Sequence, residues 1–265
     1  MPAVRPVVRS ALRPLLGRER PLWRFVRSPA LRFAAFRDPL DCLIHALLIS
    51  LPRVRFLQIG ANDGRTGDRL WTFRRFPAWS GTLVEPHGAV FQRLAANYRP
   101  WPERFHLVNA AVASTPGVRP FYHLDEGQNL PGHTDQLGSL DESLLDRHRR
   151  ELGLGDGRPL GVSEVLCVTL PDLLEHSGAV NLVVVDAEGS DAAILARMDL
   201  ATHRPEVVAY EHVHLTEEDR EATAARLEAG GYALFLARHD TLGVSREGLR
   251  RLPHLARAWA VIGPR

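Results

Sequence analysis

The sequence predicts an α/β fold in which a mostly parallel sheet is covered by helices on both faces. Short apolar runs alternate along the chain with segments whose apolar residues recur at helical spacing. The strongest apolar run, at 180–189, is β-branched without alternation, as is typical of a strand buried on both faces. A turn from Gly60 to Gly64 directly follows the first apolar run. Ligands of such sheets bind beyond the carboxyl ends of the strands, so the loops there are the places to look for chemistry.

The helices follow from apolar residues three or four positions apart and from residues that cap helix ends. The segment 216–231 begins with a Thr cap, carries acids in its first turn and ends in Gly-Gly. The segment 171–177 has Pro at its start. The predicted helices are 39–50, 67–76, 88–98, 141–152, 171–177, 190–198 and 216–231.

The strands follow from short apolar runs between these helices, most of them bounded by Gly, Pro or an acid. The predicted strands are 54–60, 81–86, 105–113, 180–189, 205–212 and 232–238, with extended segments at 118–124 and 165–170 and a last strand at 257–263.

Composition limits the class of protein. With 265 residues, of which 45% are hydrophobic, the chain can bury the core of one large α/β domain. The net charge of +2 argues neither for nor against nucleic acid. Cys42 and Cys167 lie far apart and lack metal-type spacing, so a reducing, cytoplasmic setting is the simple interpretation. No apolar run reaches the ~18 residues that a transmembrane segment needs.

Residues 1–38 differ from the rest of the chain. They are rich in Arg and Pro, and Glu19 and Asp38 are their only acids. A targeting or membrane-surface segment has this composition, but we interpret it as an N-terminal extension, with a homo-oligomer formed through it as an open alternative. We expect 39–265 to be the functional domain. Its Gly- and Pro-rich insert, 125–162, is either a lid over a substrate or a polar loop.

The turn from Gly60 to Gly64 has the composition of a ligand site. Glycine lacks a Cβ, so a ligand can approach the backbone, and free N–H groups at the start of the next helix face it. The following strand ends in Glu85, 21 residues after Gly64, where a carboxylate accepts hydrogen bonds from a ribose diol. Asn62 replaces the middle glycine of the dinucleotide fingerprint. The pattern therefore favours S-adenosylmethionine (SAM) over NAD, with a tight turn without ligand as the alternative.

Six segments in order carry a resemblance to a known family. They are FLQIGANDG, LVEPH, VNAAVAS, VTLPDLL, VVVDAEGSD and VVAYEH, and the match runs from about Phe56 to Val244. The chain resembles the FkbM family of SAM-dependent methyltransferases. The D-x-EG segment after a Val-rich strand is its more specific part. The resemblance implies a seven-stranded, mostly parallel, Rossmann-like class I methyltransferase sheet, SAM as methyl donor, and an oxygen acceptor on a small molecule or sugar, as in natural-product or glycan tailoring.

Site residues are implied by the same resemblance. The glycine turn would hold the methionine end of SAM, the acid after the second strand its ribose, and the end of the third strand its adenine. These cofactor residues are Gly60, Ala61, Asn62, Gly64, Glu85, Pro86, Asn109, Ala110 and Ala111, with Asp186 beside the methyl group. The catalytic residues at the ends of the fourth and fifth strands would be Asp186, Glu188, Glu211 and His212.

Two mechanisms are open for methyl transfer to a hydroxyl. The hydroxyl must lose its proton and be aligned about 3 Å from the methyl carbon. In one mechanism, His212 or a carboxylate is the general base. In the other, Asp186 and Glu211 hold a divalent ion such as Mg²⁺, which lowers the pKa of the hydroxyl. We interpret the pair His212 and His214 as solvated loop residues, with a transition-metal site as the alternative.

Other roles and functions also remain open. Asp186 and Glu188 could instead cap the helix that begins at Ser190. An N-methyltransferase of a small molecule or peptide, a non-catalytic SAM-binding module and an NAD-dependent oxidoreductase are the rival functions. Nucleic acid is not expected as a partner, because the basic residues cluster before the domain and no Asn-Pro-Pro-Tyr-type segment follows the fourth strand.

Overall fold

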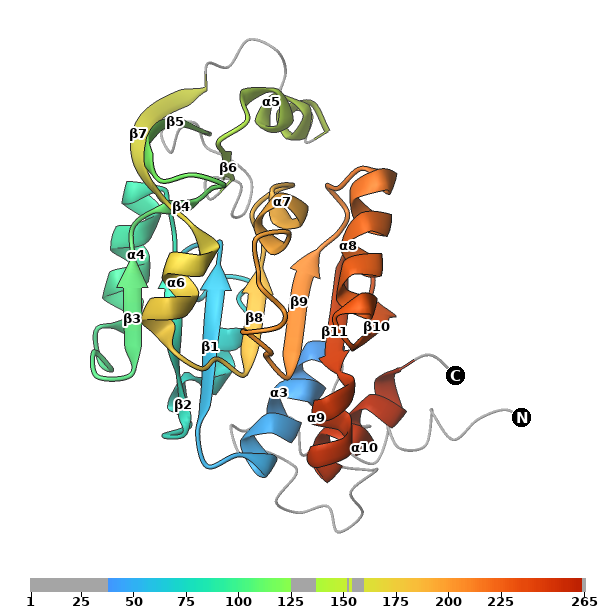
Figure 1. Cartoon of the computed structure of the whole chain (residues 1–265). Coiled ribbons are helices and arrows are strands. Elements are labelled where there is room, and N and C mark those ends of the chain that lie inside the picture. The colour runs from blue at the N-terminus through green and yellow to red at the C-terminus, as the bar shows by residue number, and fades with distance from the viewer. Residues whose placement is uncertain (1–37, 125–136, 152, 154–159, 264–265) are drawn as a thin grey trace.

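The structure, a computed structural model, describes residues 38–124, 137–151, 153 and 160–263. A seven-stranded sheet forms its centre (Figure 1). The strands are β1 (Val54–Ile59), β2 (Trp79–Val84), β3 (Phe105–Val108), β8 (Leu182–Val185), β9 (Val207–Glu211), β10 (Tyr232–Leu236) and β11 (Asp240–Ser245). Their order is β10-β11-β9-β8-β1-β2-β3, and only the two pairings of β11 are antiparallel. The predicted α/β class with seven mostly parallel strands is therefore confirmed.

Helices cover both faces of this sheet, and a separate hydrophobic core lies between the sheet and the helices on each face. Because side chains alternate along a strand, Phe56 of β1 joins one core and Leu57 joins the other. The first core contains side chains of α3 (Pro39–Ser50), the 3₁₀ helix η3 (Leu70–Arg75), α4 (Gly88–Tyr98) and α10 (Pro253–Ile262). The second contains side chains of α6 (Leu170–Ser177), α7 (Asp191–Leu195) and α8 (Glu217–Ala229).

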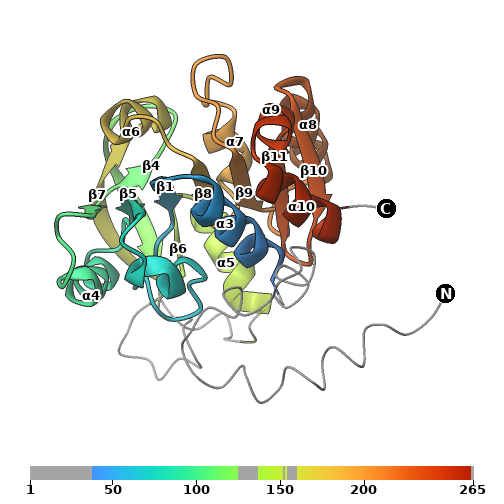
Figure 2. The same ribbon diagram turned by 90° about the horizontal axis from the view of Figure 1, so that it is seen from below.

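The last helix of the chain packs against the first described helix. α9 (Arg246–Arg251) leads from β11 into α10, and α10 packs against α3. Figure 2 shows these helices near one another when the molecule is viewed from below. Within the described ranges, no helix is both long enough and apolar enough to cross a bilayer.

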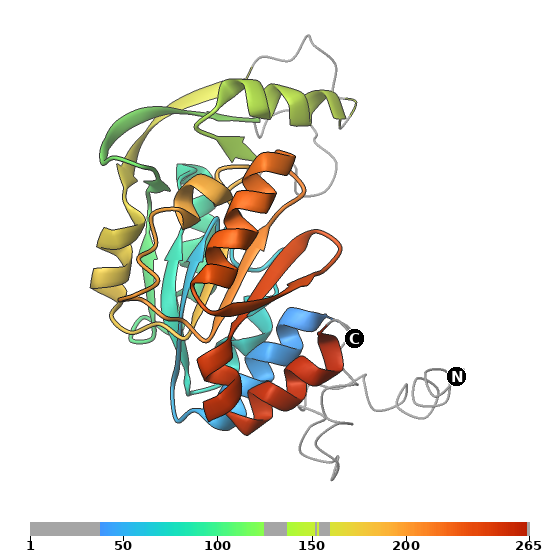
Figure 3. The ribbon, with the colours of Figure 1, turned by 45° about the vertical axis from the view of Figure 1, so that its right-hand side comes forward.

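A second, smaller sheet lies over the carboxyl ends of the large sheet's parallel strands (Figure 3). Its strands are β4 (Ala111–Val112), β5 (Gly117–His123), β6 (Gly138–Ser139) and β7 (Gly161–Val168), and α5 (Glu142–Glu151) accompanies it. Parts of the predicted insert 125–162, namely 125–136, 152 and 154–159, lie outside the described residues, as does the predicted extension except Asp38. The described part of the insert contributes β6, α5 and the start of β7.

The strand order creates a switch point at β1. Ile59 at the end of β1 pairs with Val84 of β2 on one side and with Val185 of β8 on the other, both in parallel. The chain runs outward from β1 through β2 and β3, and then returns to the opposite side of β1 as β8. The loops after β1, β2 and β8 therefore diverge there and leave room for a ligand.

One predicted strand is wrong. Residues 257–262 belong to α10 and Gly263 caps its end, because the buried Ala258 continues a helical face that begins with the buried Leu255. The seventh strand is instead β11. It follows β10 through a tight turn closed by a hydrogen bond of 2.8 Å from the Ala237 N–H to the Asp240 carbonyl oxygen. This turn lacks the Gly or Asn that signals a hairpin, so the hairpin could not be predicted from its turn.

Two other predicted elements differ in detail. The helix predicted at 67–76 is the 3₁₀ helix η3 rather than an α-helix. The strand predicted at 105–113 divides between β3 of the large sheet and β4 of the small one. Asn109 lies at the division, where its side-chain amide donates to the carbonyl oxygens of Glu85 and Pro86 at 2.8 and 3.0 Å. These bonds fix the loop where the chain leaves the large sheet.

Candidate active site

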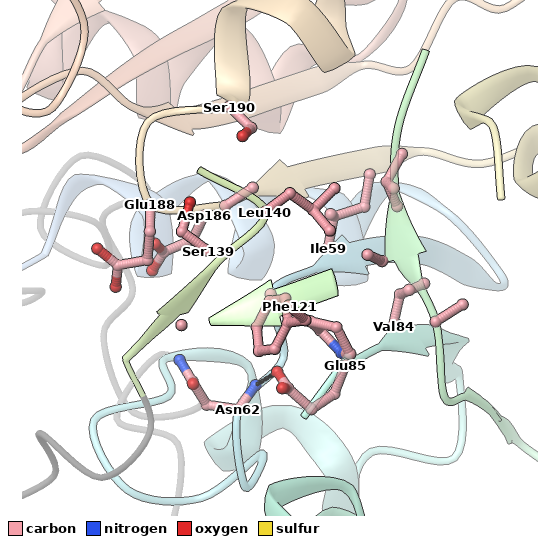
Figure 4. Close-up of a pocket in the computed structure, with 17 residues that line it drawn as sticks. Ile59, Asn62, Val84, Glu85, Phe121, Ser139, Leu140, Asp186, Glu188 and Ser190 are labelled. Atoms are coloured by element: carbon pink, nitrogen blue, oxygen red, sulfur yellow. Dashed lines mark hydrogen bonds between the residues drawn. The ribbon is translucent and has the colours of Figure 1, made fainter. Parts of the chain in front are cut away.

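Two adjoining pockets lie at the carboxyl ends of the parallel strands. The first, which we call the glycine-turn pocket, is lined by residues that include Gly60, Asn62, Glu85, Pro86, Ala110 and Ala111. The second, which we call the acidic pocket, is lined by residues that include Ala61, Asp68, Arg69, Asp186, Glu188, Glu211 and Asp240. Gly60, Asn62, Asp186 and Glu188 line both pockets. Figure 4 shows the first pocket, with Asn62, Glu85, Asp186 and Glu188 labelled among the residues that line it.

The turn after β1 has a backbone that side chains would disrupt. Gly60 has a φ of 75°, and a Cβ there would lie 1.6 Å from the backbone oxygen of Asp186. Glycine is therefore required for the turn to pass this close to the loop after β8. Asn62 is also left-handed, with a φ of 51°. Gly64 lines neither pocket, and its glycine is explained by packing, because a Cβ there would lie 2.4 Å from Leu94 of α4.

Glu85 fastens this turn to the end of β2. Its carboxylate accepts the backbone N–H of Asn62 at 2.9 Å and that of His87 at 2.8 Å. Burial raises the pKa of the Glu85 carboxyl to about 7, although both N–H donors oppose the shift. Each carboxylate oxygen has more than one lone pair, so both can still accept a hydrogen bond from a ligand in the pocket.

Small residues and one ring form the wall of the glycine-turn pocket that follows β3. Asn109 does not line the pocket but supports its wall through the two hydrogen bonds described above. The other two residues of the predicted adenine segment face the pocket, together with a ring from the small sheet. These wall residues are Ala110, Ala111 and Phe121.

Carboxylates dominate the acidic pocket. Five of its lining residues are acids, and the guanidinium of Arg69 is bound to Asp240 at 2.7 Å and to Asp38 at 3.1 Å. Burial raises the pKa of Glu188 to about 8, with the nearby Asp186 as the next cause. Burial also raises the pKa values of Asp186 and Glu211, and neighbouring carboxylates add to both shifts. Such a group is stabilised when a proton or another cation enters it.

Asp191 connects the backbone segments that carry the acids, although it was not among the predicted site residues. Its side chain is fully buried, and one oxygen accepts the N–H groups of Ala187 and Gly189, each at 3.3 Å. Its other oxygen accepts the N–H of Glu211 at 3.3 Å. Asp191 thus joins the loop after β8 to the end of β9. It also holds the turn in which Glu188 has a left-handed φ of 47°.

At the N-terminus of α7, an acid outside the predicted pair Asp186 and Glu188 binds backbone N–H groups. Ser190 makes no side-chain cap hydrogen bond. In the preceding turn, Asp191 accepts the N–H groups of Ala187 and Gly189. Asp186 and Glu188 line both pockets.

The imidazole of His214 lies close to two of the acids. Nε2 of His214 lies 3.7 Å from Oε2 of Glu188 and 3.6 Å from Oε2 of Glu211. One ligand atom from each of these three residues lies within 4.8 Å of the other two. His212 lies elsewhere: it is buried, its Nδ1 is 3.1 Å from the hydroxyl of Thr241, and it lines neither pocket.

Comparison with known protein families assigns the chain to one of them. The model of the methyltransferase FkbM domain matches residues 58–236, from within β1 to the end of β10. No curated protein matches the sequence significantly. The solved structure of methyltransferase FkbM from Methylobacillus flagellatus KT is similar, at 14% identity and a TM-score of 0.48, over 82% of this chain and 52% of that chain.

Two further solved structures are similar at low identity. Cofactor-bound Rv0187 from MTB has 14% identity and a TM-score of 0.42, over 93% of this chain and 99% of that chain. Precorrin-6y C5,15-methyltransferase from Geobacter metallireducens GS-15 has 10% identity and a TM-score of 0.41, over 76% of this chain and 83% of that chain. The family assignment rests on the domain match. Since that match spans more than half of the 265 residues, the chain belongs to the FkbM family of SAM-dependent methyltransferases.

Proposed function

We propose that this protein transfers a methyl group from SAM to a hydroxyl of a small molecule or sugar, in the tailoring of a natural product or glycan. The observation that carries the proposal is the sharing of Asp186 and Glu188 by the two pockets. A cofactor in the glycine-turn pocket would therefore adjoin an acceptor in the acidic pocket. Proximity of this kind supplies much of the rate of a bimolecular transfer.

The residues that line the glycine-turn pocket offer SAM a suitable donor set. Glu85 would accept hydrogen bonds from the ribose hydroxyls, because its oxygens retain lone pairs beside the N–H groups that they bind. The absent Cβ of Gly60 lets this turn pack against the loop after β8, so that both loops line the pocket. The small side chains of Ala110 and Ala111 would contact the flat adenine ring. When bound, SAM supplies an electrophilic methyl group.

The acidic pocket fits an acceptor that donates hydrogen bonds. Carboxylates accept hydrogen bonds from hydroxyl groups and repel phosphate or carboxylate groups. We propose that Asp186 takes the proton of the reacting hydroxyl, since it lines both pockets. His212, which was predicted as a base, would instead stabilise the contact between β9 and β11 through Thr241.

An amine is the second candidate for the acceptor. Several buried carboxylates with raised pKa values also favour an ammonium group, which would become a nucleophile after losing its proton. The described part of 125–162 borders the glycine-turn pocket through Ser139 and Leu140, and it borders the acidic pocket through Leu137. We propose that this part of the chain covers the acceptor.

Methyl-labelled SAM tests the proposal. The full chain is incubated with labelled SAM and a panel of hydroxylated sugars, polyketides and peptides, and the labelled products are identified. Asp186→Asn should lower the rate by roughly 10²-fold or more, the usual scale for lost acid–base help, while S-adenosylhomocysteine (SAH) still binds. Glu228→Gln, an exposed acid on α8, is the matched control and should keep the wild-type rate. A wild-type rate in Asp186→Asn would contradict the role of Asp186.

A further inference from the structure

We infer that Glu188, Glu211 and His214 bind one divalent transition-metal ion, such as Mn²⁺ or Zn²⁺, at the edge of the acidic pocket, which the two glutamates line and His214 does not. The ion's role in activating the acceptor rests on the proposed function. The binding site stands on the geometry and chemistry of the three side chains. This ligand set differs from the pair Asp186 and Glu211 that the sequence suggested, because Glu188 and an imidazole take the place of Asp186.

The distances suit a single ion. Nε2 of His214 lies 3.6 and 3.7 Å from the two carboxylate oxygens, and all three ligand atoms lie within 4.8 Å of one another. A point equidistant from three such atoms is roughly 2.1 to 2.4 Å from each, close to the metal–oxygen and metal–nitrogen distances of Zn²⁺ sites. An ion would thus need only small movements to contact all three.

The donor set selects the kind of ion. One imidazole nitrogen and two carboxylate oxygens suit first-row transition ions, whereas Mg²⁺ prefers oxygen ligands and water. Oε2 of Glu211 is buried and has no hydrogen-bond partner among the described residues. A buried polar oxygen without a partner is costly, and coordination would satisfy it. Three protein ligands leave positions open for an acceptor hydroxyl.

The ligands are also held in place by the rest of the site. Asp191 accepts N–H groups on both sides of Glu188 and the N–H of Glu211, so the two elements that carry the acids are joined. His214 lies three residues after Glu211 in the loop that follows β9. The neighbouring Asp186 and Asp240 add negative charge, whereas Arg69 is engaged by Asp240 and Asp38. The field at the three ligands therefore favours a cation.

Manganese binding tests the inference without any substrate. The untagged full chain is stripped with EDTA, dialysed and titrated with Mn²⁺, and free Mn²⁺ is measured by electron paramagnetic resonance. The wild type should bind one ion per chain, and added Zn²⁺ should displace it. Glu188→Gln and His214→Ala should each weaken binding by at least about 10-fold. Glu228→Gln and His106→Ala, which alter an exposed acid and an exposed histidine outside the site, should bind as the wild type does.

SAH calorimetry on the same samples separates the two proposals. If the chain binds SAH but neither Mn²⁺ nor Zn²⁺, the inference is overturned and the proposed function stands. Equal Mn²⁺ affinity in the wild type, Glu188→Gln and His214→Ala would overturn it as well, since the ion would then lie elsewhere. If the ion binds as expected but no acceptor is methylated, the metal site stands and the proposed function fails. SAH binding by each variant also shows that it is folded.

Discussion

Replacing Gly60 by alanine tests the geometry on which the site depends. At a φ of 75°, alanine costs roughly 1 kcal/mol relative to glycine, because its Cβ meets its own backbone. The new Cβ would also lie 1.6 Å from the backbone oxygen of Asp186, whereas ordinary contact begins at 3.4 Å. The two loops must therefore separate by well over an ångström, and overpacking of this kind costs roughly 1–3 kcal/mol. We expect Gly60→Ala to lose about 2–4 kcal/mol of unfolding free energy, as the sum of these two costs.

Gly231→Ala is the matched control. Gly231 also has a positive φ, 89°, but an added Cβ would meet nothing within 4 Å, so only the backbone cost of roughly 1 kcal/mol remains. Urea denaturation measures both variants, and SAH calorimetry follows binding. Gly60→Ala should lose more stability and bind SAH more weakly, whereas Gly231→Ala should keep the wild-type affinity. Equal stability loss and unchanged SAH affinity in the two variants would refute the close approach of the loops.

Three further predictions concern buried carboxylates. Glu85→Gln removes a charged acceptor and should weaken SAH binding by about 1.5–3 kcal/mol in calorimetry, and unchanged affinity would contradict the ribose role. Asp191→Asn places an amide among three N–H donors and should lower the unfolding free energy by roughly 1–3 kcal/mol in urea, with Asp172→Asn, an exposed acid, as control. Burial raises the pKa of Glu85 from 4.5 to about 7, so its contribution to stability is fully present below about pH 4.5 and is lost as pH rises through about 7. The melting temperature of the wild type should fall across this window relative to Glu85→Gln, and parallel profiles would refute the shift.

Local patterns in the sequence were enough to predict the architecture. Gly60, Glu85 and Asp186 each follow an apolar run, and the parallel order of β1, β2 and β8 brings their loops to one place. Strand ends are predictable because a buried parallel strand must stop where the polar residues begin. The hairpin of β10 and β11 was missed because its turn lacks glycine and asparagine, and because α10 contains an apolar run that a strand could also have.

The details of the acidic pocket could not be predicted in the same way. Asp191 has no local signal, since its role depends on N–H groups of two loops that only the fold brings together. His212 and His214 are equivalent in a short sequence pattern, but the first is buried against β11 and the second faces Glu188. The spacing of three residues between Glu211 and His214 was the available clue. It becomes informative only when the chain turns after β9.

The most direct test of the account is the identity of the atom that receives the methyl group. The full chain is incubated with SAM carrying a ¹³C-labelled methyl group and the panel of hydroxylated acceptors, and the product is examined by NMR, in which methyl carbons on oxygen, nitrogen and carbon have distinct chemical shifts. The account predicts a labelled methyl carbon bonded to oxygen, with its rate reduced in Asp186→Asn. A label found only on nitrogen or carbon would contradict it.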